Sequence, residues 1–134
     1  MFVELSRAFQ NMGDNQQAAT LGLSALKLFE NIKDTFGILH SLNNTIAIGY
    51  NGDWKTAISY QLKILEYTRS YKNERMQALA NANLGDAYLR LNRPDSALSY
   101  LSASFEYTSK KADVYDLAGD YRNFGIYYKQ AATL

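Results

Sequence analysis

Apolar side chains recur at spacings of three and four along almost the whole chain, which gathers them on one face of an amphipathic helix. The pattern predicts seven helices, over about residues 1–12, 16–31, 36–50, 54–70, 74–91, 95–110 and 114–130. Turn-forming residues separate them, most clearly Asn51-Gly52-Asp53 and Asn92-Arg93-Pro94. We expect Asp53 to cap the helix that follows it. Because the connections are short, we expect neighbouring helices to pack antiparallel.

The same residue types return after steps of about forty residues, which is typical of a helical repeat array. The recurring sets are Asn43, Asn83 and Asn123; Gly85 and Gly125; Tyr88 and Tyr128; Ala57 and Ala97; Tyr60 and Tyr100. They divide the chain into repeats over about residues 1–33, 34–72, 73–112 and a shortened 113–134. No linker rich in glycine and serine interrupts them, so we predict one domain over residues 1–134.

The best copy of the repeat carries Leu84-Gly85, Tyr88, Ala97 and Leu101. With this spacing it resembles the tetratricopeptide repeat (TPR), in an extended form of about forty residues. The second copy departs from the family pattern, because Asn44-Thr45 stand where leucine and glycine are expected. The resemblance implies an all-α, TPR-like superhelical solenoid of antiparallel helix pairs, with about three and a half repeats. It also implies that the first helix of each pair lines a concave groove.

Gly85 and Gly125 lie inside predicted helices, where glycine costs about 1 kcal/mol relative to alanine. A close approach of the second helix of the pair would explain this cost, since glycine lets two helix backbones come near each other. Ala57 and Ala97 are the small residues expected on the facing helices. We therefore predict that Gly85 packs against the helix that carries Ala97.

The composition narrows the range of partners. Hydrophobic residues make up 47% of the chain and charged residues 20%, as in ordinary globular proteins. A net charge of +1 predicts no nucleic-acid partner, and the lack of cysteine excludes disulfides and thiolate metal sites. No apolar run reaches the ~18–20 residues of a membrane helix, and Met1-Phe2-Val3-Glu4 does not resemble a signal peptide. We expect no membrane contact by this segment and a cytoplasmic location.

Candidate catalytic groups are few. His40 is the single histidine of the chain, so a zinc site with several histidine ligands is excluded. No glycine–serine–glycine turn presents a nucleophile, and the glycines form no phosphate-binding loop. Asp113, Asp116 and Asp120 gather near the start of the last helix, where we expect them to complement the helix dipole. We predict no enzymatic activity, no metal site and no cofactor.

Asn43, Asn83 and Asn123 recur at one position inside the first helix of each pair, although asparagine forms helices poorly. In one interpretation their amides hydrogen-bond a neighbouring helix and close the contact between repeats. In the other, the resemblance places them in the groove, because an asparagine at this position of related extended repeats holds the backbone of a bound peptide. An amide offers the donor and the acceptor that a peptide unit needs. The sequence leaves both interpretations open.

The resemblance also places charged residues in this groove, namely Asp86, Arg90, Arg122 and Lys129. An excess of bases favours an acidic segment or a C-terminal carboxylate as the ligand. For each of these residues the alternative is a solvated helix face that binds nothing.

The resemblance implies a protein–protein interaction module that binds a peptide or partner segment in its concave groove. A second hypothesis is a sensory or regulatory segment of a larger bacterial signalling protein, such as a sensor kinase or a transcription regulator. It rests on the run Arg93-Pro94-Asp95-Ser96-Ala97-Leu98, which is similar to repeats found upstream of such proteins. A third hypothesis is a scaffold without ligand that self-associates as a homo-oligomer through its last helix.

Overall fold

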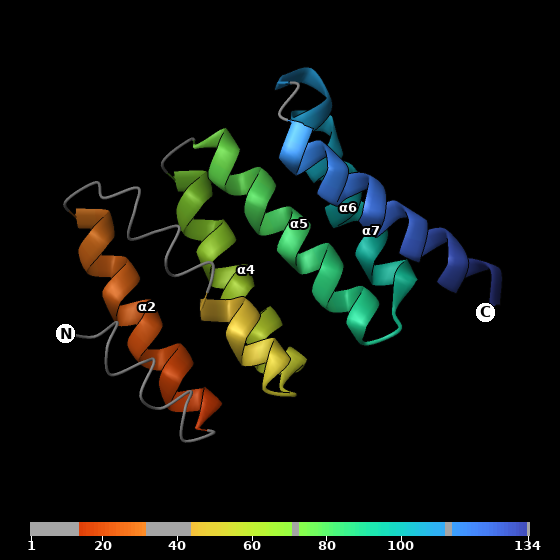
Figure 1. Cartoon of the computed structure of the whole chain (residues 1–134). Helices are drawn as coiled ribbons and strands as arrows, with labels where there is room; N and C mark the ends of the chain where they lie inside the picture. The colour runs from red at the N-terminus through yellow and green to blue at the C-terminus, as the bar shows by residue number, and fades with distance from the viewer. Residues whose placement is uncertain (1–13, 32–43, 71–72, 112–113, 134) are drawn as a thin grey trace. The chain divides into compact units, whose positions relative to one another are not determined.

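The computed structural model describes residues 14–31, 44–70, 73–111 and 114–133, and helices make up nearly all of them (Figure 1). The labelled helices are α2 (Asn15–Asn31), α4 (Trp54–Ser70), α5 (Glu74–Arg90), α6 (Pro94–Lys111) and α7 (Val114–Thr133). Residues 44–50 are helical as well. The described residues contain no strand, and the predicted all-α class is confirmed. The predicted helix over 1–12 and the first part of the one over 36–50 lie outside the described residues.

Several helix ends differ by one residue from the predicted ones and the end of α7 by three, and two of these differences have simple physical reasons. Helix α6 begins at Pro94 and not at Asp95, because the fixed φ of proline suits the first position of a helix. Helix α7 continues to Thr133 beyond the predicted end near residue 130, because Ala131 and Ala132 are strong helix formers.

Contacts divide the chain into two units, Met1–Glu66 and Tyr67–Leu134, and the boundary lies inside α4. The prediction of one domain over residues 1–134 stays a prediction. In the second unit, α5 packs against α6 and α7, and α6 also packs against α7. Leu89, Ala97 and Leu101 form a buried cluster in this unit, and aromatic side chains of α7 pack against it.

The turn between α5 and α6 uses a left-handed residue to end the first helix. Asn92 has a φ of 56°, and its N–H donates to the Leu89 carbonyl at 2.9 Å. The next N–H, from Arg93, reaches back to the Tyr88 carbonyl at 2.9 Å. This pair of hydrogen bonds is a Schellman motif, which satisfies carbonyls at the helix end. Gly52 occupies the equivalent position forty residues earlier and also has a positive φ, 97°.

The N-terminal ends of three helices are capped by polar side chains. Asp14, Asp53 and Asn73 each accept a hydrogen bond from the backbone N–H three residues further on, at 3.1, 3.0 and 3.1 Å. Each cap satisfies one of the N–H groups that a helix start leaves without a partner. The predicted capping role of Asp53 is confirmed.

Gly85 of α5 packs tightly against α6. A Cβ atom built on Gly85 would overlap the side chain of Leu101, which is fully buried on α6. Ala97, one turn before Leu101 on α6, is fully buried as well. The predicted packing of Gly85 against the helix of Ala97 is therefore confirmed. A Cβ atom built on Gly125, the repeat equivalent of Gly85, would meet nothing within 4 Å.

In the first unit a polar pair occupies the place of the Gly85–Leu101 contact. Thr45 and Gln61 stand forty residues before Gly85 and Leu101, and the Thr45 hydroxyl donates to Gln61 Oε1. Both side chains are buried. This hydrogen bond explains why the second copy can depart from the leucine–glycine pattern, since threonine and glutamine replace glycine and leucine together.

Helix α7 is attached to α6 through a buried carboxylate. Asp120 is 2% exposed, and it accepts hydrogen bonds from the hydroxyls of Ser104, at 2.9 and 3.1 Å, and Thr108, at 2.6 Å. The expectation that Asp120 complements the helix dipole was wrong, because this side chain turns inward to α6. Of the other two carboxylates, Asp116 is half-buried and Asp113 lies outside the described residues.

Candidate functional site

Helix α5 presents different polar residues on two opposite sides. Asn83, Asp86 and Arg90 follow one another at spacings of three and four, so they share one face of the helix. Gln77 and Asn81 are also four apart, and their stripe lies roughly on the opposite side of the helix, because each residue turns the direction by about 100°.

On the first side, Asp86 and Arg90 form a partly buried ion pair. The distance between Arg90 Nε and Asp86 Oδ1 is 3.5 Å, and the two side chains are 40% and 18% exposed. The geometry falls short of a hydrogen bond, and Oδ1 of Asp86 is buried without a hydrogen-bond partner among the described residues. Arg90 is the more exposed of the two side chains and is therefore the member of the pair that a ligand can contact.

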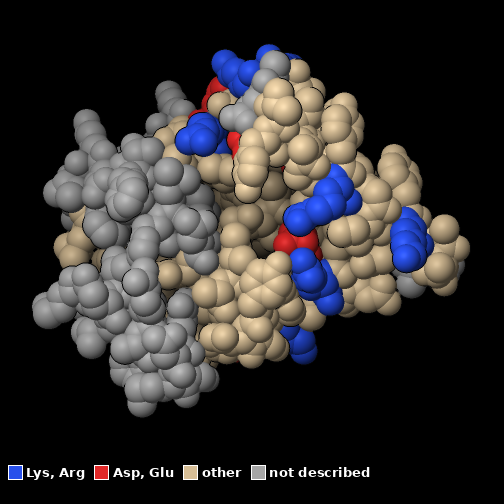
Figure 2. Space-filling view, in the orientation of Figure 1, with Lys and Arg blue, Asp and Glu red and all other residues tan. Residues whose placement is uncertain are grey.

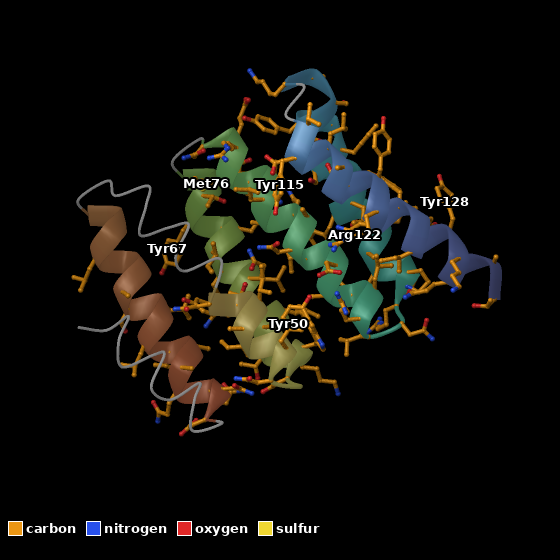
Figure 3. The ribbon with its side chains drawn as sticks, in the orientation of Figure 1. Tyr50, Tyr67, Met76, Tyr115, Arg122 and Tyr128 are labelled. Carbon is orange, nitrogen blue, oxygen red and sulfur yellow. The ribbon has the colours of Figure 1, made fainter. Side chains whose placement is uncertain are left out.

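Helix α7 lies beside this side of α5 and supplies further polar groups. Arg122 Nη2 donates to Asn123 Oδ1 at 3.4 Å, and Asn123 is only 3% exposed. Figure 3 shows Arg122 on α7, next to α5. Figure 2 shows an acidic surface set between basic ones over α5 and α7. We call the surface formed by Asn83, Asp86, Arg90 and Arg122, with Asn123 buried beneath Arg122, the α5–α7 face.

A hydrogen bond near the end of α5 helps to hold the two helices together. Gln130 Nε2 of α7 donates to the Leu89 carbonyl of α5 at 2.8 Å. This bond lies near Arg90 in the sequence of α5, so it fixes the end of α7 beside the charged part of the α5–α7 face. The sequence analysis did not identify Gln130, because a side chain that bonds a carbonyl on another helix has no local sequence signature.

The structure places the predicted site residues unequally. Asp86, Arg90 and Arg122 lie on the α5–α7 face, and Asn83 is half-buried there. Asn123 is buried and contacts Arg122, while Lys129 is exposed on α7. Asn43 and His40 lie outside the described residues.

A groove that the sequence analysis did not predict opens on the other side of α5. Its volume is about 510 Å³, and it is lined by the end of α4, the first half of α5 and the second half of α6. The polar lining includes Arg69, Gln77, Asn81, Tyr107, Lys110 and Lys111. None of the predicted site residues lines it. We call it the α4–α6 groove.

The described part of the chain contains neither a candidate metal site nor a helix that could span a membrane. No group of three histidine, cysteine or acidic residues there is placed to hold a metal ion. None of the helices described is both long and apolar enough to cross a membrane.

Comparison with known proteins identifies one family. Residues 78–111 match the family model of the tetratricopeptide repeat. No curated protein and no solved structure matches the chain. The matched segment contains the Gly85–Leu101 contact between α5 and α6, which is the packing that the recurring glycine predicts. The match therefore supports the resemblance to the tetratricopeptide repeat over residues 78–111, which form most of the α5–α6 pair.

Proposed function

We propose that the chain is a protein–protein interaction module that holds an acidic peptide segment of a partner along the α5–α7 face. Tetratricopeptide repeats in general mediate protein–protein interactions and are not catalytic. The observation that carries the proposal is the pair of exposed guanidinium groups, Arg90 and Arg122, on two helices that pack together. Asp86 lies next to Arg90 in a partly buried ion pair, which helps to orient the Arg90 side chain toward a ligand.

The bases of the α5–α7 face would bind the acidic groups of the segment. Arg90 and Arg122 are exposed on neighbouring helices, and a guanidinium can bind a carboxylate through two parallel hydrogen bonds. Lys129 adds a third positive charge two turns beyond Arg122 on α7. Together these bases outnumber Asp86, which leaves the face with an excess of positive charge.

The two asparagines have different parts in this arrangement. Asn83 is half-buried on α5, and its amide offers a donor and an acceptor to a peptide backbone. Asn123 is buried against Arg122, so it positions the guanidinium and does not itself face the ligand. The part of Asn43 in peptide binding stays a prediction, because this residue lies outside the described ones.

Selection from a random peptide display library, with the whole chain as bait, tests this proposal. We expect enriched peptides to carry aspartate, glutamate or a free C-terminal carboxylate near their centre of contact. Their affinity should fall by about tenfold or more in Arg122→Glu, which replaces attraction by repulsion. Lys63→Glu is the matched control, because Lys63 is an exposed lysine of α4 outside the α5–α7 face. Peptides without acidic groups, or equal loss in the two variants, would contradict the proposal.

Self-association through α7 is the second candidate function that we propose. Tyr121 and Tyr128 are seven residues apart on one side of α7 and are 60% and 66% exposed, and exposed aromatic side chains on one helix face often mark an interface. We expect sedimentation to show oligomers whose proportion rises with concentration and falls in Tyr121→Lys. A monomer from micromolar to near-millimolar concentration would rule this function out. The regulatory hypothesis stays a prediction.

A further inference from the structure

The α4–α6 groove differs from the α5–α7 face in both position and lining. It is formed where the last turns of α4 and α6 approach the first turns of α5. Ala78 and Ala103 contribute small side chains to its wall, which keeps the space open. A volume of about 510 Å³ lies within the range of pockets that hold ligands, about 300–1,000 Å³.

The charges around the groove favour an anionic ligand. Three bases line it, Arg69, Lys110 and Lys111, together with two acids, Glu74 and Glu106. Lys110 and Glu106 lie 3.5 Å apart and offset each other. Arg69 and Lys111 form no ion pair with another described residue, so two cations and the single carboxylate of Glu74 remain. The groove therefore carries an excess of positive charge.

The basic residues of α6 are not required by the repeat architecture. Glu106-Tyr107 recurs forty residues earlier as Glu66-Tyr67, so this part of the lining follows the repeat. Lys110-Lys111 does not recur, because Ser70-Tyr71 stand at the equivalent positions. Because the repeat does not need these two lysines, they can serve to bind a ligand.

The remaining polar residues suit a peptide. Asn81 is half-buried in the wall, and its amide offers both a donor and an acceptor. Gln77 is held in place because its Nε2 atom donates to the Thr68 carbonyl at 3.2 Å. Tyr107 is half-buried and adds an aromatic surface, on which an apolar side chain of the ligand can pack.

We infer that the α4–α6 groove is a second binding site, which takes an acidic peptide segment of a partner protein. Arg69 and Lys111 bind carboxylates of the segment, Asn81 binds its backbone, and Tyr107 contacts an apolar side chain. Because this groove and the α5–α7 face lie on opposite sides of α5, one repeat can hold two segments at once. The inference goes beyond the proposed function and does not depend on it.

Nuclear magnetic resonance of the whole 15N-labelled chain, titrated with a short glutamate-rich peptide, tests the inference. We expect the side-chain amide signals of Gln77 and Asn81 to shift as the peptide is added. Charge reversal in Arg69→Glu or Lys111→Glu should weaken this binding by about tenfold. Arg122→Glu and Lys63→Glu should leave it unchanged, and circular dichroism confirms that each variant is folded.

Three results would overturn the inference. The first is a titration in which the Gln77 and Asn81 signals do not move up to millimolar peptide. The second is equal binding by a control peptide with every glutamate replaced by glutamine, because the site would then not recognise charge. The third is loss of these shifts in Arg122→Glu but not in Lys111→Glu, which would assign the binding to the α5–α7 face. Conversely, failure of the α5–α7 proposal alone leaves the expected shifts intact.

Discussion

At the scale of single residues, Asn92 shows how one backbone conformation defines the turn between α5 and α6. Its positive φ disfavours most side chains, and a residue with a Cβ loses about 1–2 kcal/mol in this region. Asparagine tolerates the conformation better, and glycine tolerates it best. The side chain is exposed, so a substitution there changes the backbone preference and removes little packing.

We predict that Asn92→Ala lowers the free energy of unfolding by about 1 kcal/mol and that Asn92→Gly leaves it unchanged or slightly higher. Gly52→Ala should show a similar loss, because Gly52 also has a positive φ. Urea denaturation of the three variants measures the differences. Equal stability of Asn92→Ala and Asn92→Gly would show that the turn does not depend on this conformation.

The ionised carboxylate of Asp53 caps helix α4, so the stability that this cap contributes depends on pH. Burial raises the pKa of Asp53, but hydrogen bonds from the hydroxyl and backbone N–H of Thr56 outweigh it and hold the pKa below its ordinary value of 3.8. A lowered pKa in the folded state means that the carboxylate stabilises the fold above that ordinary value. This contribution is lost as the pH falls through the folded pKa.

We predict that Asp53→Asn keeps the stability at neutral pH, because asparagine caps a helix as well as aspartate does. The variant should lose less stability than the wild type when the pH is lowered from neutral to below 3.8. Asp53→Ala, which removes the cap, should lose about 1 kcal/mol at neutral pH. Denaturation at both pH values measures this. An identical acid-induced loss in Asp53→Asn and wild type would contradict the prediction.

At the scale of helix pairs, Gly85 and Gly125 form a natural comparison. They occupy equivalent positions on α5 and α7, but only Gly85 faces a helix in the described residues. We predict that Gly85→Leu lowers the free energy of unfolding by about 1–3 kcal/mol or more through overpacking against Leu101. Gly125→Leu should be neutral or stabilising by up to about 1 kcal/mol, because leucine forms helices better than glycine. Similar destabilisation in both variants would disprove the assigned packing.

The Thr45–Gln61 hydrogen bond predicts that the effects of substituting these two residues on stability depend on each other. Thr45→Val and Gln61→Leu should each destabilise the chain by about 1–3 kcal/mol, because each leaves a buried polar group without its partner. The double variant should lose less than the sum, with a coupling free energy of about 1 kcal/mol. A double-mutant cycle by urea denaturation gives this value. Strictly additive losses would mean that the two side chains do not depend on each other.

At the scale of the whole molecule, the sequence predicted the features that depend on local preference and on the repeat. The helices, the cap at Asp53 and the contact of Gly85 belong to this group. The hydrogen bonds of Asp120 with α6 were not predicted, because they depend on how two helices are rotated against each other. The Thr45–Gln61 pair did leave a signal, since both residues depart from the repeat pattern together.

The two candidate sites were predictable from the sequence to different degrees, because one depends on spacing within a helix and the other on how helices pack. The spacing of Asp86 and Arg90 places them on one face of one helix, so their proximity follows from the sequence alone. The α4–α6 groove combines the ends of three helices, and the approach of these ends depends on packing angles that the sequence pattern does not give. Lys110-Lys111, as a departure from the repeat, was the signal that could have indicated it.

The peptide affinity and the melting temperature of Asn83→Ala test most directly the central claim that the α5–α7 face binds a peptide. With a peptide selected on the wild-type chain, the account predicts a loss of affinity worth about 0.5–1.5 kcal/mol, the net value of one hydrogen bond. The melting temperature should change little, because the amide faces the ligand and not a neighbouring helix. A clear drop in melting temperature, with peptide affinity unchanged for the folded variant, would contradict the claim and make Asn83 a packing residue.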